Sequence, residues 1–257
     1  MEPLAREFFE RPSTEVAPEL LGCVFWHDSR ADTASPAGHD GPADPASPAG
    51  LVAVRLVEVE AYQGAFDPAS HAFRGQTARN AVMFGLPGHV YVYFTYGMHF
   101  CVNIVCQPAG QAEAVLLRAG EVICGVDLAT SRRARERGRP VRPRDLARGP
   151  ARLCQALDID RGLDGTDLCA VGSPLGIGPP VSAGMSATGP RSGAAVPGAR
   201  PAVMSGPRVG VSEAADRPWR YWLAGDGHVS LYRPWVPRAP RQKPVAGRDG
   251  GDGTMHP

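Results

Sequence analysis

Two short stretches of the chain combine an acid with flat aromatic side chains. In residues 57–62, Glu60 ends an apolar run and Tyr62 follows it two positions later. In residues 89–98, four aromatic side chains fall within six positions and are followed by a glycine. A positioned carboxylate can activate water, and aromatic rings can stack on a flat molecule. Together the two stretches predict hydrolysis of a planar substrate, for which a nucleobase is the first candidate.

A second acid, Glu58, belongs to the same run. Side chains alternate along a strand, so Glu58, Glu60 and Tyr62 are expected on one face. A carboxylate that is partly removed from water becomes a stronger base. The alternative is that either glutamate only pairs with an arginine at the edge of a sheet. We expect one of the two to be structural and the other catalytic. The paired acids of a sugar hydrolase flank their substrate, whereas these two point the same way, which disfavours that reaction.

The cationic side chains are almost all arginine. The single lysine, Lys243, lies in a Pro-rich tail, so a Schiff base in the folded part is disfavoured and hydrolysis there should use water. Nine arginines fall between residues 132 and 152, although the net charge of the chain is only +1. Such a cluster can meet phosphates. The alternative is a solvated helix face or a loop, and we interpret the stretch as loop.

Cysteine usage and the N-terminal residues bear on metal sites and on location. The six cysteines form no C-x-x-C pair and have no histidine nearby at metal-binding spacing. They predict reduced, mostly buried thiols and no metal site. The first residues lack the apolar core of a signal peptide, and no run approaches the roughly 18 apolar residues of a membrane helix. The protein is therefore expected in the cytoplasm and away from membranes.

The elements that must position these residues follow from apolar runs and turn residues. They predict a single domain over residues 1–237, of the α/β class and the α+β type. We expect a curved, mostly antiparallel β-sheet with flanking helices and a β-hairpin that protrudes at residues 96–97. Low-complexity inserts are predicted at about 31–50 and 172–207, and a disordered tail at 238–257. Expected helices cover 7–21 and 149–157, and expected strands lie at 23–26, 51–60, 89–105, 114–119, 208–211 and 219–223.

Taken together, these motifs resemble the alkyladenine (3-methyladenine) DNA glycosylase family. The resemblance runs from about residue 8 to about residue 235, apart from the two inserts, and the spacing of several blocks makes it specific. The matching blocks are 57–62, 70–71, 76–80, 83–84, 87–88, 91–98, 115–119, 149–157 and 208–211, together with Asn103.

The resemblance implies a monofunctional DNA glycosylase, which flips a damaged purine out of duplex DNA and hydrolyses its N-glycosidic bond. The family needs no metal and no other cofactor. Glu60 resembles the general base that activates water, which leaves Glu58 to support the strand. Arg118 resembles the residue that holds this water, together with the backbone carbonyl of Val209.

The base pocket of the family is matched residue by residue as well. Tyr62, His71 and Tyr93 resemble the walls that hold the flipped base, with His71 also able to donate a hydrogen bond. Asn103 resembles the side chain that excludes normal guanine through a clash with its exocyclic amine. Tyr96 resembles the residue that fills the gap left in the base stack.

The expected partner is double-stranded DNA that contains damaged purines, and the protein is expected to act as a monomer associated with the nucleoid. The same rings and arginines also fit a non-catalytic nucleic-acid-binding module, which remains the alternative. Cationic alkylated purines leave readily, whereas neutral lesions such as hypoxanthine need a proton donor. The sequence identifies no such acid, so the preferred lesion stays open.

Overall fold

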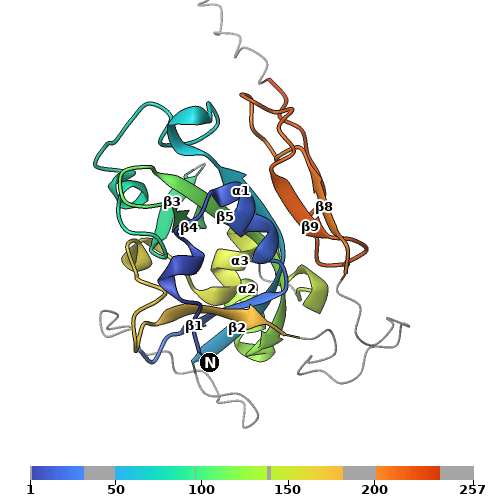
Figure 1. Cartoon of the computed structure of the whole chain (residues 1–257). Helices are drawn as coiled ribbons and strands as arrows, with labels where there is room; N and C mark the ends of the chain where they lie inside the picture. The colour runs from blue at the N-terminus through green and yellow to red at the C-terminus, as the bar shows by residue number, and fades with distance from the viewer. Residues whose placement is uncertain (1, 32–49, 96, 138–139, 182–200, 238–257) are drawn as a thin grey trace, which may run out of the picture.

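Nine strands pair into one sheet in the described part of the chain. The structure, a computed structural model, describes residues 2–31, 50–95, 97–137, 140–181 and 201–237 (Figure 1). All strand pairings within these residues are antiparallel, and three α-helices accompany the sheet in a single domain. The predicted α+β class with a mostly antiparallel sheet is therefore confirmed. The strands are β1 (Cys23–Asp28), β2 (Leu51–Tyr62), β3 (Val90–Thr95), β4 (His99–Cys106), β5 (Glu113–Cys124), β6 (Ala147–Arg148), β7 (Leu175–Pro180), β8 (Val203–Gly206) and β9 (Arg220–Leu223), and the helices are α1 (Ser13–Glu19), α2 (Val126–Arg137) and α3 (Pro150–Leu157).

Strand β2 lies at the centre of the sheet and carries the acidic motif. It pairs with β5 along one edge, and along the other edge first with β1 and then with β9. Its register with β5 shifts on both sides of Glu58. Such bulges change the direction in which side chains point. Glu58 and Glu60 are both fully buried, and both contact Arg118 of β5.

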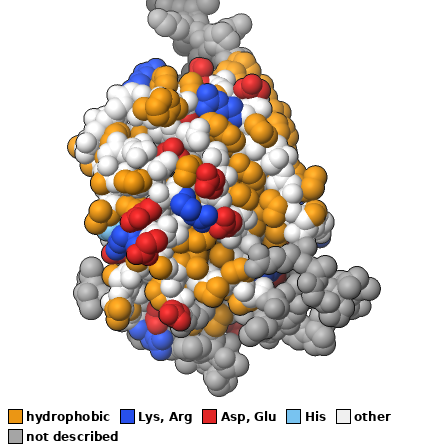
Figure 2. Space-filling view, viewed as in Figure 1, with side chains coloured by type: hydrophobic (Ala, Val, Ile, Leu, Met, Phe, Trp, Pro, Cys, Tyr) orange, Lys and Arg blue, Asp and Glu red, His pale blue; other side chains and the backbone are white. Residues whose placement is uncertain are grey.

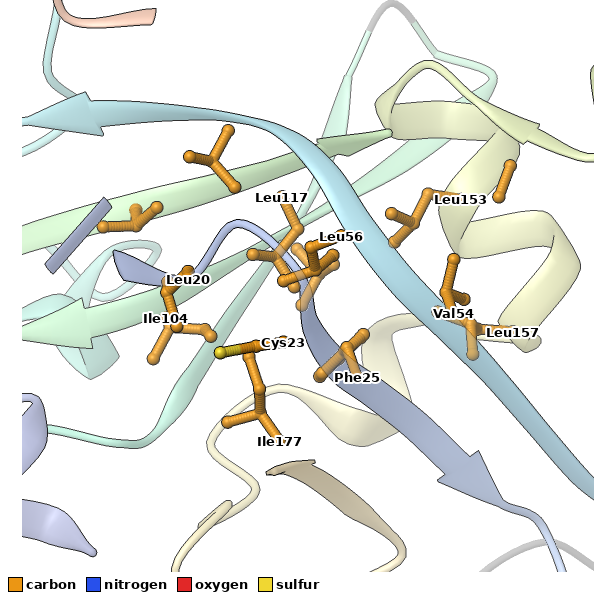
Figure 3. Close-up of a cluster of buried hydrophobic side chains, with 14 of the residues drawn as sticks. Leu20, Cys23, Phe25, Val54, Leu56, Ile104, Leu117, Leu153, Leu157 and Ile177 are labelled. Atoms are coloured by element: carbon orange, nitrogen blue, oxygen red, sulfur yellow. The ribbon is translucent and has the colours of Figure 1, made fainter. Parts of the chain in front are cut away.

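Helix α3 covers the sheet and closes the hydrophobic core. Figure 3 shows Leu153 and Leu157 of this helix near apolar side chains of the neighbouring strands, among them Val54 and Leu56. The helix begins at Pro150, whose fixed backbone suits a first turn, directly after Gly149 with a φ of 116°. The predicted helix over 149–157 is confirmed, and its N-terminus points toward the site described below.

The opening helix is shorter than predicted. Instead of one helix over 7–21, the chain forms a 3₁₀ turn at Arg6–Phe8 and then α1, which begins after Pro12. Proline lacks an amide hydrogen and cannot continue a helix from the preceding turn. Pro12 therefore explains the break, which the spacing of apolar residues alone does not indicate.

Residues 208–211, predicted as a strand, form an irregular segment instead. Gly210 has a φ of 71°, which lies outside the strand region of the backbone map. The side chain of Arg208 is fully buried and pairs with Asp67. Val209 and Val211 are only half-buried and Gly210 is exposed, so the two valines indicate neither a strand nor a core position here.

Two strands fall inside the predicted insert at 172–207. Strand β7 pairs with β1, and β8 pairs with β9, so the prediction is wrong at both ends of this segment. Leu175 and Ile177 of β7 are fully buried. Burial of these two side chains stabilises the strand despite the glycines and prolines around it. Residues 32–49 and 182–200, within the two predicted inserts, and residues 238–257, the predicted tail, lie outside the described residues.

The arginine-rich stretch is also more ordered than a loop. Its first part belongs to α2, and Arg132 and Arg133 are buried there. Arg132 Nη1 donates to the carbonyl of Ala156 at the C-terminal end of α3, 3.3 Å away. These two arginines hold two helices together and are not part of a phosphate-binding surface.

The remaining global predictions concern thiols, charge and membranes. Four of the six cysteines are buried, namely Cys23, Cys101, Cys106 and Cys154. The face shown in Figure 2 mixes basic, acidic and apolar side chains, in keeping with the net charge of +1. Within the ranges that the structure describes, no helix has the length and apolar character needed to cross a membrane.

Candidate active site

A cavity of about 510 Å³ lies where β2 to β5 meet the N-terminus of α3. Residues 68–71, Met83 and residues 209–213 complete its wall. Six of the predicted site residues line it, namely Tyr62, His71, Tyr93, Asn103, Arg118 and Val209. Glu60 lies directly behind this lining and contacts three of its members. Tyr96, the predicted residue for the gap in the DNA, lies outside the described residues.

Three donors fix the carboxylate of Glu60. The amide of Val209 donates to Oε1 over 2.7 Å, and the hydroxyl of Tyr62 donates to Oε2 over 2.9 Å. Arg118 Nη1 lies 3.2 Å from Oε1. The resemblance predicts a role for the carbonyl of Val209, and the structure adds that its amide orients the acid. Glu60 is thus a fully buried acid held in one orientation beside a cavity.

Glu58 is the centre of a second group of polar contacts. Its Oε1 accepts from Arg118 Nε over 2.9 Å and from Arg220 Nε over 2.7 Å. Ser230 donates to Oε1 through its hydroxyl over 2.9 Å and to Oε2 through its amide over 2.6 Å. Burial alone would raise the pKa of Glu58, but Arg118 and Arg220 outweigh it and lower that pKa. Glu58 is therefore a buried anion inside the sheet, and not an acid paired at its edge.

Arg118 connects the two acids. Its side chain is 7% exposed and bridges Glu58 and Glu60. Burial lowers the pKa of a guanidinium, yet the two carboxylates together raise the pKa of Arg118. Arg118 and Arg220 balance the charges of Glu58 and Glu60, which explains how two acids remain buried side by side.

Tyr62 is positioned from behind by a cation. The guanidinium of Arg208 lies 4.6 Å from the centre of the Tyr62 ring and 5.2 Å from that of Trp219. Arg208 is itself held by Asp67, with 2.8 Å between Nη2 and Oδ1. Burial and the charge of Glu60 raise the pKa of Tyr62 well above its usual range. The phenol therefore stays protonated and keeps its hydrogen for Glu60.

His71 and two tyrosines form the aromatic wall across the cavity. The rings of His71 and Tyr93 meet edge to face, with their centres 4.5 Å apart. His71 Nδ1 lies 3.1 Å from the hydroxyl of Tyr91, whose ring stacks on Tyr93 at 5.6 Å. Burial, and to a smaller extent the charge of Arg79, lowers the pKa of His71. The imidazole is thus neutral at pH 7 and can donate one hydrogen bond.

Asn103 lies on β4 at the bottom of the same wall. It is buried, and its Nδ2 donates to the carbonyl of Tyr91 over 3.1 Å. This bond fixes the amide group, so the group resists displacement by a ligand. Next to it, burial raises the pKa of the Cys101 thiol to about 11, which keeps this part of the lining uncharged.

Comparison with known proteins identifies the family of the chain. The pattern of the family described as Methylpurine-DNA glycosylase (MPG) matches residues 45–227. A protein of Streptomyces avermitilis named "Putative 3-methyladenine DNA glycosylase" is 48% identical over 241 residues, which cover 93% of this chain and 96% of that protein. Proteins of the same name from Leifsonia xyli and Frankia casuarinae are 47% and 45% identical; the matches cover 89% and 91% of this chain, and 92% and 94% of those proteins. The chain belongs to the methylpurine-DNA glycosylase family.

Membership of the methylpurine-DNA glycosylase family confirms the resemblance inferred from the sequence motifs. It makes the chain a DNA glycosylase, a DNA-binding hydrolase of DNA repair whose substrate is DNA with damaged bases. The cavity described above is therefore the candidate site for a damaged base.

Four residues of this glycosylase site were absent from the predicted set. Tyr91 supports His71, and Arg208 supports Tyr62; Arg220 and Ser230 hold Glu58. Tyr91 could have been found, since it alternates with Tyr93 along the same strand face. Arg208 stands in one of the matching blocks, whose sequence predicts a strand and not a buried arginine. Arg220 and Ser230 carry no local sequence signal for this role.

Proposed function

We propose that the protein is a monofunctional glycosylase that flips an alkylated purine out of duplex DNA and hydrolyses its N-glycosidic bond with water activated by Glu60. The observation that carries this proposal is the fully buried Glu60 carboxylate, oriented by Tyr62, Val209 and Arg118 beside an aromatic cavity. An acid that is oriented before the substrate arrives need not reorganise during the reaction.

The proposed reaction moves one proton and breaks one bond. Water loses a proton to Glu60 while its oxygen bonds to C1′ of the deoxyribose. The electrons of the N-glycosidic bond leave with the base. Glu60 also stabilises the positive charge that develops on the sugar, and Arg118 keeps the carboxylate in place. Both effects depend on the low solvent exposure of the site.

The aromatic wall supports recognition of an alkylated purine. Alkylation at N3 or N7 makes the base cationic, and electron-rich rings attract a cation over their faces. Tyr62 on one side and His71 with Tyr93 on the other would enclose such a base. Asn103, fixed by the carbonyl of Tyr91, would clash with the exocyclic amine of normal guanine. Tyr96 would fill the space that the flipped nucleotide leaves.

Release of the damaged base from methylated DNA tests the proposal. The wild-type protein should release 3-methyladenine from a methylated duplex, and Glu60→Gln should slow single-turnover release by about 10²- to 10⁴-fold. The matched control is Glu121→Gln, because Glu121 is another buried glutamate, paired with Arg55 and outside the cavity lining. The proposal fails if Glu60→Gln releases the base as fast as this control does. A protein that binds the duplex without releasing any base would instead be a binding module.

The absence of lyase chemistry is part of the proposal. Lyase glycosylases form an imine from a protein amine, and the one lysine, Lys243, stands in the C-terminal tail. Borohydride should therefore trap no covalent complex, and the product strand should break only after alkali. A trapped complex would contradict the monofunctional assignment.

The proposed oligomeric state and location are tested separately. Sedimentation of the protein with and without a lesion duplex should give a monomer and a one-to-one complex. Imaging of a tagged protein should place it with the nucleoid in the cytoplasm.

A further inference from the structure

We propose that Glu58 is a positioning residue for the reaction, because it restrains Arg118 from forming a two-pronged pair with Glu60. The inference rests on the proposed function, since it assigns Glu58 a role through the base Glu60. Glu58 is not among the residues that line the cavity. It acts through the guanidinium of Arg118, which contacts both acids.

The geometry of Arg118 is the first argument. Its Nε donates to Glu58 over 2.9 Å, and Nη1 approaches Glu60 at 3.2 Å. A guanidinium can instead present two parallel N–H groups to one carboxylate, and such a pair is stronger than a single contact. Without an acceptor for Nε, Arg118 would turn both prongs to Glu60. The carboxylate oxygens already accept from Val209 and Tyr62, and a second contact with the cation would make them less able to take a proton from water.

The charge balance of the cluster is the second argument. Glu58 and Glu60 face Arg118 and Arg220, and all four side chains are at most 7% exposed. Removal of the charge of Glu58 leaves two buried cations against one anion. The excess positive charge would bind Glu60 more tightly and would oppose the cationic character that develops on the sugar.

The segment that follows β9 supplies the third argument. Ser230 gives Glu58 two hydrogen bonds, and Arg220 links both residues because its Nη2 also donates to the Ser230 carbonyl over 3.1 Å. These contacts leave Glu58 little freedom to rotate. They fix the position from which Glu58 holds Arg118, so the C-terminal part of the domain contributes to the site without lining the cavity.

The test compares Glu58→Gln with the control Glu121→Gln. Both substitutions keep the shape of a buried glutamate and remove its charge next to an arginine. Glu58→Gln should lower the single-turnover excision rate at least 10-fold while affinity for an abasic-site duplex stays within twofold. The acidic limb of its pH–rate profile should move to lower pH, because the charge of Glu58 no longer offsets that of Arg118 and Arg220 beside Glu60. Glu121→Gln should leave the rate and the profile unchanged, even if its thermal midpoint falls.

Ser230→Ala tests the same role with a smaller change, should Glu58→Gln not fold. It removes one hydrogen bond to Glu58 and no charge, and the rate should fall two- to fivefold with unchanged abasic-site affinity. Wild-type rates in both variants overturn the inference, and so does a rate loss without a shifted pH profile in Glu58→Gln. Glu60→Gln is measured in parallel. If Glu60→Gln remains active, the proposed function has failed, whereas activity in Glu58→Gln alone removes only the role of Glu58.

Discussion

At the scale of single residues, Arg208 explains how a ring that faces the cavity is held in place. Its guanidinium lies between the rings of Tyr62 and Trp219 and donates to the carbonyl of Ala61 over 3.1 Å. Asp67 binds it through both carboxylate oxygens. Since the Tyr62 hydroxyl also orients Glu60, one buried ion pair fixes both a wall of the cavity and the proposed base.

Replacement of Arg208 by glutamine should be strongly destabilising. The side chains of Arg208 and Asp67 are both fully buried, so the variant leaves a buried carboxylate without its cation. Removal of one partner of a buried pair costs about 3–5 kcal/mol. Urea denaturation monitored by circular dichroism should show a loss of this size in the free energy of unfolding. The double variant Arg208→Gln, Asp67→Asn should be more stable than the sum of the single losses predicts; strict additivity would mean that the pair does not interact.

The residues that could be predicted from the sequence are those whose function has a local pattern. Glu60 and Tyr62 stand two positions apart on one strand, and Tyr93 belongs to an alternating aromatic run. Ser230 and Arg220 reach Glu58 across 172 and 162 positions of the chain. Contacts of this kind depend on how the strands pair, and no local spacing indicates them.

At the scale of elements, the close approach of β2 and β5 places Arg118 between the two acids. Gly120 stands two residues after Arg118 and pairs with Leu56. A Cβ atom at Gly120 would lie 2.4 Å from Val54 Cγ1 and 2.7 Å from the Arg55 carbonyl oxygen. The absence of a side chain at this position therefore allows the two strands to pack at their observed distance.

Gly120→Ala should accordingly destabilise the sheet. Overpacking of a well-packed interior costs about 1–3 kcal/mol, and here backbone as well as side chain must move. Gly227→Ala is the matched control, because a Cβ there meets no atom within 4 Å. Chemical denaturation of both variants should show a clear loss for Gly120→Ala and a change within about 0.5 kcal/mol for Gly227→Ala. Equal stability of the two variants would contradict the packing argument.

The same scale explains which elements could be predicted. Strands β2, β4 and β5 are long and apolar, and their existence follows from composition alone. The segment 208–211 has similar composition but is irregular, because Arg208 turns inward and Gly210 takes a positive φ. Apolar composition alone therefore does not decide whether a short segment pairs as a strand; contacts with neighbours distant in the sequence decide it.

At the scale of the whole molecule, buried ion pairs connect segments that are far apart in the chain. Glu58 joins β2 to β5 and β9, and Arg208 joins residues 207–212 to Asp67. A third group consists of Arg55, Glu121 and Asp226, with 2.8 Å and 2.6 Å between Arg55 Nη2 and the two acids. Figure 1 shows β8 and β9 lying along one side of the domain. Strand β9 is attached there by its pairing with β2 and by the contact of Arg220 with Glu58.

This arrangement predicts that the fold loses stability in acid. Burial would raise the pKa of Asp226, but hydrogen bonds from His228 and Arg55 outweigh it and hold that pKa well below its usual range. The pKa of Glu58 is lowered as well. A depressed pKa contributes stability that is fully present above the unfolded value of about 4 and is lost as the pH falls through the folded value. The free energy of unfolding should therefore decrease steadily below about pH 4.

Asp226→Asn isolates one part of this dependence. The variant cannot lose a charge in acid, so its free energy of unfolding, measured by urea titration between pH 2 and 7, should start lower at pH 7 and fall less steeply below pH 4. Asp216→Asn, which changes an exposed acid, should keep the wild-type slope. If Asp226→Asn and the wild type lose stability in parallel, folding does not lower the pKa of Asp226, and the contact with Arg55 does not stabilise its charge. A shallower slope would instead mean that Asp226 is the anion that ties the turn after β9 to the central strand.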